Sequence, residues 1–303
     1  MIFFVYVADG NNDVTVIDTA SNSVVTSIIA AGGTFGIAVT PDGKQVWVTN
    51  SSADSVSVIN TADNAVIGNI QVQRIPLGLA LTPDGRRAYV ANSNSNSVSV
   101  IDTREKKVIA TVQLGTKATG ASGVGVSPDG KRLYVTNVDS TDVAVINTAD
   151  NSIVATIPVG EPQDAGSPQV AVSPDGKHAY VGQPALSVID TTSNTVVATV
   201  SGVSHTLGVA ITPDGKRVYV ANRSSKTVSV VDTATNAVVA TLTGLITPSG
   251  IAMTPDGKNV YVTDQDASNN AGFVRVIDTD TNRVTATIKV ERAPFGIAIG
   301  PPR

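Results

Sequence analysis

The chain has 303 residues, of which 42% are hydrophobic and 15% are charged, and its formal net charge is −4. It contains no cysteine, which excludes disulfide bridges, thiolate metal sites and a cysteine nucleophile. The acidic balance argues against a nucleic-acid partner, because phosphate binding needs a concentrated basic surface. No run approaches the roughly 18 apolar residues of a membrane-spanning helix, so no membrane insertion is expected.

The chain begins with three segments rich in β-branched residues, Val5 to Asp9, Val14 to Thr19 and Val24 to Ile28. Alternating β-branched residues bounded by turn formers predict three short strands. The first of them overlaps the apolar start, Met1 to Val7, which lacks the basic region and the long apolar region of a signal peptide. We therefore expect the fold to begin directly at these strands.

The next segment shows a complete unit of four predicted strands, which we name A to D. They cover Gly36 to Thr40, Val46 to Asn50, Val56 to Thr61 and Ala65 to Ile70. A Pro-Asp-Gly turn joins A to B, since proline presets φ, aspartate bonds back to the backbone and glycine supplies a positive φ. The three strands at the start of the chain correspond to B, C and D, without an A strand.

The Pro-Asp-Gly turn recurs at intervals of 39 to 46 residues, which is typical of an array of four-stranded units. One large aromatic residue stands at the same B-strand position in every unit, and this predicts a packing layer between neighbouring sheets. The turns begin at Pro41, Pro83, Pro128, Pro174, Pro213 and Pro255, and the aromatic residues are Tyr6, Trp47, Tyr89, Tyr134, Tyr180, Tyr219 and Tyr261.

The chain ends with a lone A strand, Gly296 to Gly300, before a degenerate copy of the turn at Pro301. Paired with the three strands at the other terminus, it completes a seventh sheet and removes the open edges of a linear array. We therefore predict an all-β fold. It is a seven-bladed β-propeller of four-stranded antiparallel blades, a single domain over residues 1–303, monomeric and without a cofactor.

The B strands carry a recognisable motif, Tyr134-Val135-Thr136-Asn137, with variants beginning at Tyr89, Tyr219 and Trp47. This motif resembles the YVTN family of β-propeller repeats, which is similar to modules of archaeal surface-layer proteins and to bacterial periplasmic propellers. The resemblance covers the whole chain. It implies an extracellular, cell-surface or periplasmic location, and it brings no catalytic motif.

Loop lengths separate the two faces of the predicted propeller. The A–B and C–D turns share one face and keep a constant length, whereas the B–C and D–A connections share the opposite face and vary. Rigid scaffolds place binding residues on variable loops, so we expect a site on this variable face. The D–A joints surround the mouth of the central channel with Phe35, Leu77, Ser122, Gln169, Leu207, Ser249 and Phe295.

Two features of these joints stand out. Gln169 takes the position of a glycine that the other six A strands keep, and we expect it to project into the channel. Phe35 and Phe295 belong to neighbouring blades once the ring closes, and they would form an apolar lip. With the charged loop residues, the predicted ligand-binding residues are Phe35, Arg74, Lys117, Glu161, Asp164, Gln169, His205, Arg223, Glu291, Arg292 and Phe295.

These residues favour a non-enzymatic binding or cell-surface scaffold propeller whose partner is a protein or a small molecule. One alternative is a lyase or lactone-hydrolase type of enzyme at the channel mouth, with His205 as a general base beside Glu161 or Glu291. Another alternative is an anion or nucleic-acid binder that uses the basic loop residues. These basic residues are Arg74, Lys117, Arg223 and Arg292.

A calcium loop is a further possibility in the longest B–C connection, where Asp264, Asp266 and Ser268 have suitable spacing. The segment has no glycine at the sixth position, and Arg275 stands where a bidentate glutamate is required. We therefore interpret this segment as a polar hairpin loop and expect no metal.

Overall fold

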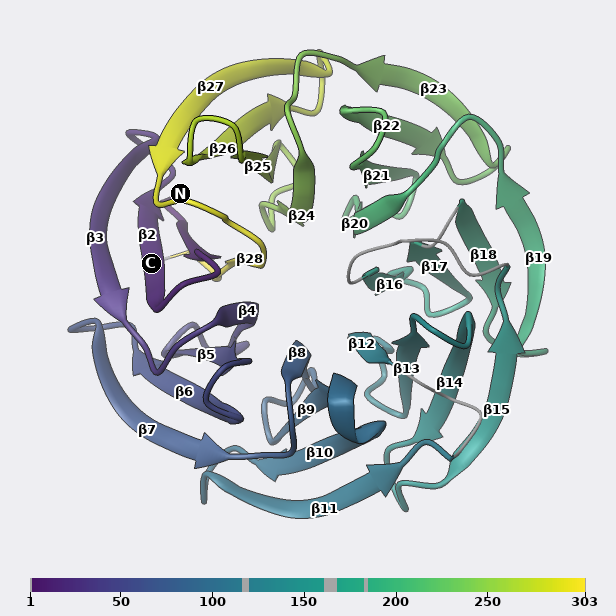
Figure 1. Cartoon of the computed structure of the whole chain (residues 1–303). Coiled ribbons are helices and arrows are strands. Elements are labelled where there is room, and N and C mark those ends of the chain that lie inside the picture. The colour runs from purple at the N-terminus through teal and green to yellow at the C-terminus, as the bar shows by residue number, and fades with distance from the viewer. Residues whose placement is uncertain (1, 116–119, 161–167, 183–184, 303) are drawn as a thin grey trace.

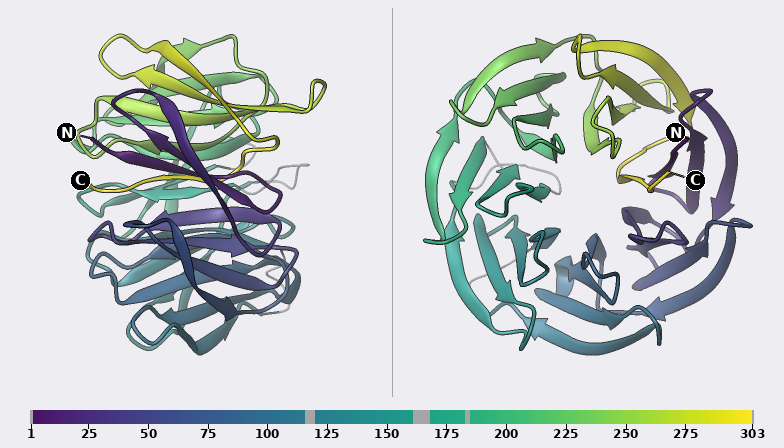
Figure 2. Two further views of the ribbon diagram at one scale, coloured as in Figure 1. Left: turned by 90° about the vertical axis from the view of Figure 1, so that its left-hand side faces the viewer. Right: turned by 180° about the vertical axis from the view of Figure 1, so that it is seen from behind.

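The computed structural model describes residues 2–115, 120–160, 168–182 and 185–302. In this part of the chain, 28 strands form seven antiparallel sheets of four strands each, arranged as the blades of a ring around a central channel (Figure 1). Figure 2 shows the ring from behind and from the side. The predicted seven-bladed propeller is confirmed. The one helix among these residues is the three-residue 3-10 turn η1 (Ser93–Ser95), so no helical segment of the described chain could span a membrane.

Each blade runs from an innermost A strand to an outermost D strand. The A strands are β28 (Ile297–Ile299) of blade 1 and then, for blades 2 to 7, β4 (Thr34–Val39), β8 (Pro76–Leu81), β12 (Ala121–Val126), β16 (Val170–Val172), β20 (Thr206–Ile211) and β24 (Pro248–Met253). The B strands are β1 (Phe4–Ala8), β5 (Gln45–Asn50), β9 (Arg87–Asn92), β13 (Arg132–Asn137), β17 (His178–Gly182), β21 (Arg217–Asn222) and β25 (Asn259–Asp266).

The outer two strands of the blades follow the same order. The C strands are β2 (Asp13–Asp18), β6 (Ser55–Asn60), β10 (Ser97–Asp102), β14 (Asp142–Asn147), β18 (Leu186–Asp190), β22 (Thr227–Asp232) and β26 (Ala271–Asp278). The D strands are β3 (Ser23–Ile29), β7 (Ala65–Gln71), β11 (Lys107–Gln113), β15 (Ile153–Pro158), β19 (Thr195–Val200), β23 (Ala237–Leu242) and β27 (Arg283–Val290).

The two ends of the chain close the ring within blade 1. Strand β28 pairs with β1 in antiparallel register, with Val5 opposite Ile299 and Val7 opposite Ile297. Two further backbone bonds, from Ala8 N–H to Gly296 O and from Phe295 N–H to Ala8 O, extend this pairing toward the channel mouth. The predicted closure by a C-terminal A strand is therefore confirmed.

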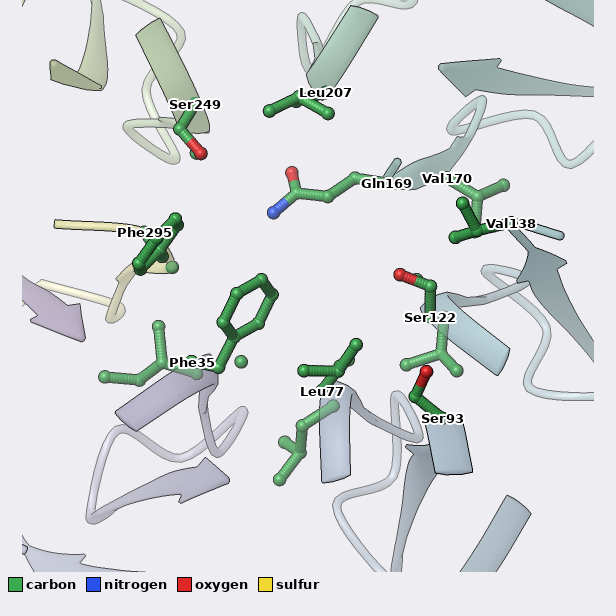
Figure 3. A pocket seen from close by; sticks show the side chains of 18 of the residues that line it. Phe35, Leu77, Ser93, Ser122, Val138, Gln169, Val170, Leu207, Ser249 and Phe295 are labelled. Atoms are coloured by element: carbon green, nitrogen blue, oxygen red, sulfur yellow. The ribbon is translucent and has the colours of Figure 1, made fainter. Parts of the chain in front are cut away.

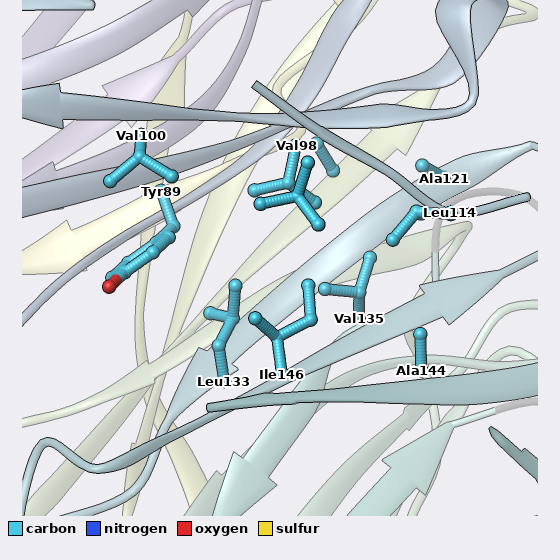
Figure 4. Close-up of a cluster of buried hydrophobic side chains, with 11 residues drawn as sticks. Tyr89, Val98, Val100, Leu114, Ala121, Leu133, Val135, Ala144 and Ile146 are labelled. Carbon is cyan, nitrogen blue, oxygen red and sulfur yellow. The ribbon is translucent and has the colours of Figure 1, made fainter. Parts of the chain in front are cut away.

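The core lies between neighbouring blades. Tyr89 and Val100 of blade 3 pack against Leu133, Val135 and Ile146 of blade 4, as Figure 4 shows. The tyrosines and the tryptophan at the repeated B-strand position are all at most 2% exposed. Burying one large ring per blade removes much apolar surface from water and supports the ring of sheets.

The hydroxyl groups of two of these tyrosines bond to the next blade. Tyr219 donates to Asn282 Oδ1 at 2.7 Å and Tyr261 donates to Asn22 Oδ1 at 2.9 Å. Both asparagines lie in C–D turns in the left-handed conformation, with φ near 50°. These two buried hydroxyls are therefore satisfied, because an acceptor is supplied across the blade interface.

The threonine and the asparagine of the B-strand motif form hydrogen bonds between strands and between blades. Thr49 accepts a hydrogen bond from Gly36 N–H and donates one to Leu77 O of the next blade, at 2.8 and 2.7 Å. The side-chain amide of Asn50 donates to the hydroxyls of Ser55 and Ser57 on the C strand. The motif residues thus link the strands within a blade and link neighbouring blades.

Candidate functional site

A cavity of about 510 Å³ opens at the mouth of the channel on the variable face. It is walled by the starts of the A strands and by B–C turns, and Figure 3 shows the side chains from close by. All seven residues expected around the mouth line this cavity: Phe35, Leu77, Ser122, Gln169, Leu207, Ser249 and Phe295.

Glycines let the A strands approach one another closely enough to form this wall. A Cβ added at Gly36 would lie 2.1 Å from Leu77 O, and one added at Gly250 would lie 2.0 Å from Phe295 O. Side chains cannot fit where the backbone of the next blade comes so near. The small residues that the sequence shows on the A strands are therefore required by contacts between blades.

Phe35 and Phe295 form one side of the cavity. Their rings stack with centroids 5.0 Å apart and an angle of 24° between the ring planes. The pair joins blades 1 and 2, where the chain termini meet. The expected apolar contact between the two rings is present.

Gln169 lies on the other side, in blade 5. Its side chain extends from the start of β16 into the opening, as Figure 3 shows. The side-chain amide makes no hydrogen bond to any other residue among those described. An amide at this place presents a donor and an acceptor to whatever enters the cavity.

One acidic and one basic side chain also line the cavity. Asp139 belongs to the B–C turn of blade 4, and its Oδ2 would lie 2.9 Å from a Cβ at Gly120. Arg223 belongs to the corresponding turn of blade 6, and its backbone N–H donates to His205 O at 3.1 Å. Neither side chain forms an ion pair with another described residue. The cavity thus has polar groups on blades 4 to 6 opposite an aromatic wall.

The other predicted site residues are placed differently. Arg74, His205, Glu291 and Arg292 do not line the cavity. The guanidinium of Arg292 contacts Asn270 Oδ1 at 3.5 Å, whereas Glu291 is exposed. Lys117, Glu161 and Asp164 lie outside the described residues.

Two of the alternatives are not supported by these positions. The acid–base site would need His205 beside Glu161 or Glu291, and neither His205 nor Glu291 reaches the cavity. Of the basic residues expected to form an anion patch, only Arg223 of the three described ones lines it.

The long B–C loop of blade 7 is a polar hairpin, as the sequence indicates. Asp264 is fully buried, where its Oδ2 accepts a hydrogen bond from Arg275 Nε at 2.8 Å. Asp266 instead closes the turn by accepting hydrogen bonds from the backbone N–H groups of Ser268 and Asn269. No cluster of three potential metal ligands occurs among the described residues.

Sequence reasoning missed Asp139 and Ser93 as cavity residues. Ser93, Val138 and Arg223 all follow the last residue of the B-strand motif directly, and all three line the cavity. The register of the repeat could have identified this position, since residues at one place in every unit share one place in the ring.

Comparison with known families matches the chain to the model of the family described as "Lactonase, 7-bladed beta-propeller", over residues 5–109 and 182–296. The chain belongs to this family. The segment between the two matches, residues 110–181, supplies Asp139 and Gln169 to the cavity. The third charged or amide group of the cavity wall, Arg223, lies within the second matched range.

Several solved structures share the fold. A chain of Kuenenia stuttgartiensis hydrazine synthase is 26% identical, with a TM-score of 0.78 over 88% of this chain and 90% of that one. A functionally unknown protein from Desulfotomaculum acetoxidans is 18% identical, with a TM-score of 0.81 over 99% of both chains. Dihydro-heme d1 dehydrogenase NirN, in complex with DHE, is 16% identical, with a TM-score of 0.69 over 97% of this chain and 74% of that one. No curated protein sequence matches the chain.

Proposed function

We propose that this propeller binds a small, partly apolar molecule in the cavity at the channel mouth, without catalysing a reaction. The observation that carries the proposal is the pairing of a stacked Phe35–Phe295 wall with polar groups from blades 4 to 6. A concave, mostly apolar site with a few convergent polar groups is the usual form of a small-molecule site, and about 510 Å³ is within the usual size range.

The proposal also includes a location outside the cytoplasm and a monomeric state. The likeness to YVTN repeats and to surface-layer modules supports a location outside the cytoplasm, and a protein partner on the variable face would be compatible with the same cavity. A monomer is proposed, because the ring of blades is closed by its own termini.

The experiment is a screen of planar and aliphatic small molecules by ligand-observed NMR. We expect binders that are lost in the Phe35→Ala/Phe295→Ala variant. They should be kept in a matched control, Val197→Ala, whose side chain is exposed on the outermost strand of blade 5. A second variant replaces residues 113–122 and 158–168 by short repeat versions. If binders persist in both the aromatic variant and the loop variant, the site lies elsewhere.

Lactone hydrolysis is the second candidate, and membership of the lactonase family favours it. In that case Asp139 would activate water as a general base, and Arg223 would stabilise negative charge on the attacked carbonyl. Hydrolysis of a panel of five- and six-membered lactones, followed by pH-stat titration, tests this. Turnover that Asp139→Asn abolishes would establish the enzyme, and rates equal to those of buffer alone would remove this candidate.

A further inference from the structure

Gln169 projects into the cavity from a position in the repeat that is otherwise glycine. Six blades place glycine there, with the carbonyl of the next blade 2.0 to 2.4 Å from any added Cβ. Blade 5 accommodates a long side chain at this place, so its backbone must differ from that of the other six.

The backbone of blade 5 shows how the glutamine fits. The N–H of Gln169 donates directly to Leu207 O of the next blade at 2.8 Å, whereas the equivalent N–H groups of Gly36, Gly123 and Gly250 donate to B-strand threonines.

The B strand of blade 5 carries the compensating change. Gly182 stands where other blades have threonine or alanine, and its N–H donates to Gln169 O at 3.1 Å. A Cβ at Gly182 would lie 2.7 Å from Thr206 O of the next blade. In blade 5 the glycine thus stands on the B strand and the residue with a side chain stands at the A strand, which reverses the arrangement of the other blades. This reversal places an amide in the channel.

The surroundings of that amide define what it would bind. Gln169 extends from blade 5 toward the stacked rings of Phe35 and Phe295 on blades 1 and 2 (Figure 3). Aromatic walls favour flat rings, which stack with little loss of conformational freedom. A primary amide pairs best with a group that offers a donor and an acceptor side by side, since both of its hydrogen bonds can then form.

We propose that the ligand is a planar ring with adjacent donor and acceptor atoms on one edge, such as a lactam or a heteroaromatic base. The ring lies against Phe35 and Phe295, and its edge pairs with the Gln169 side chain, whose Oε1 accepts and whose Nε2 donates. This inference rests on the proposed binding function and specifies its ligand class.

The test compares two flat bicyclic probes of the same shape by isothermal titration calorimetry. The probe 2-quinolinone offers an N–H beside a carbonyl, whereas coumarin, the corresponding lactone, offers acceptors only. Wild-type protein should bind 2-quinolinone about tenfold more tightly, the effect of one added hydrogen bond. Gln169→Leu, which keeps the size of the side chain, should bind the two probes equally, and Gln169→Glu should weaken 2-quinolinone. Phe295→Leu should weaken both probes by a similar factor.

Equal affinities in the wild type would overturn the inference and leave the binding function standing, because the cavity would still take a flat ring. A preference that survives in Gln169→Leu, whose fold is checked by circular dichroism, would also overturn it. If neither probe binds, the inference fails, and the small-molecule screen then decides the binding function separately. Coumarin consumed during the titration would instead support lactone hydrolysis.

Discussion

The buried carboxyl of Asp9 should make the protein less stable at neutral pH than in mild acid. Asp9 directly follows strand β1 in the closing blade and is fully buried. Burial is the main cause that raises its pKa from 3.8 to about 7; the nearby carboxylates of Asp13 and Glu291 act in the same direction, and two hydrogen bonds from Thr15 oppose the shift. Its Oδ1 has no partner among the described residues.

The sign follows from the proton balance. Between about pH 4 and pH 7 the folded protein holds a proton on Asp9 that the unfolded chain has released, so stability falls as the pH rises through this window. A pKa raised from 3.8 to about 7 corresponds to about 4 kcal/mol, which is lost almost completely by pH 8. Local relaxation reduces the cost of a buried charge, so the expected loss is about 2 to 4 kcal/mol.

The substitution that tests this is Asp9→Asn. Asparagine is the residue that blades 2, 3, 4 and 6 carry at the equivalent position, where Asn50 and Asn92 donate to hydroxyls of the C strand. Thr15 offers a hydroxyl at the corresponding place, so the amide should fit. We expect the variant to gain about 2 to 4 kcal/mol at pH 8 and close to nothing at pH 4.

The wild type and Asp9→Asn are denatured with urea at pH 4, 6 and 8, and unfolding is monitored by the fluorescence of Trp47. The difference between their free energies of unfolding is then compared at each pH. Asp264→Asn is the matched control, because this equivalent aspartate is paired with Arg275 and also accepts from the N–H groups of Ile246 and Thr247. Its loss should destabilise by about 3 kcal/mol. A gain for Asp9→Asn that is the same at pH 4 and pH 8 would refute the reasoning, and so would a loss at pH 8.

Two further substitutions test the contacts between blades. Gly250→Ala should destabilise by about 2 to 4 kcal/mol in urea denaturation, because its Cβ would lie 2.0 Å from Phe295 O. Gly68→Ala is the control and should be neutral, since its Cβ would come closest to the flexible Lys106 side chain, at 3.3 Å, and would otherwise make ordinary contact with Val58. Equal effects of the two would contradict the close-approach argument. Trp47→Tyr should cost stability that Lys106→Asn partly restores, with a coupling of about 1 kcal/mol in a double-mutant cycle. The other six C–D turns carry an asparagine at this position, and in two of them it accepts a hydrogen bond from the tyrosine of the preceding blade. A coupling energy of zero would show that the residue at position 106 does not interact with the aromatic residue at position 47.

Much of the fold could be predicted from the repeat, because each unit states the same strand pattern. The B strand expected over Val46 to Asn50 is observed as β5 (Gln45–Asn50), and the closing strand expected over Gly296 to Gly300 is observed as β28 (Ile297–Ile299). A bulge between the C and D strands was not predicted. It occurs in all seven sheets, for example between Val58 and Ile59, and no residue type in these strands marks its position.

The cavity could be predicted in part. The residues of the D–A joints were identified, because their place in the ring follows from the strand order. Asp139 was not, because the loop in which it lies has no unusual length. The exchange between Gln169 and Gly182 shows a different limit. A single sequence shows that a glycine is missing, but the carbonyl of Leu207 that replaces the usual bond is visible only in three dimensions.

Some residues that depart from the repeat are compensated by a second residue that also departs from it, and others are not. The carboxylate of Asp264 is compensated by Arg275, and this ion pair links the B and C strands of blade 7. Asp9 faces the hydroxyl of Thr15 and has no such compensating charge, which is why its carboxyl should lower stability at neutral pH. The backbone carbonyl of Gln169 accepts a hydrogen bond from Gly182 N–H, but the side-chain amide has no hydrogen-bond partner among the described residues. An amide built into the channel at the expense of the repeat, and left without a partner there, has its best explanation in a ligand.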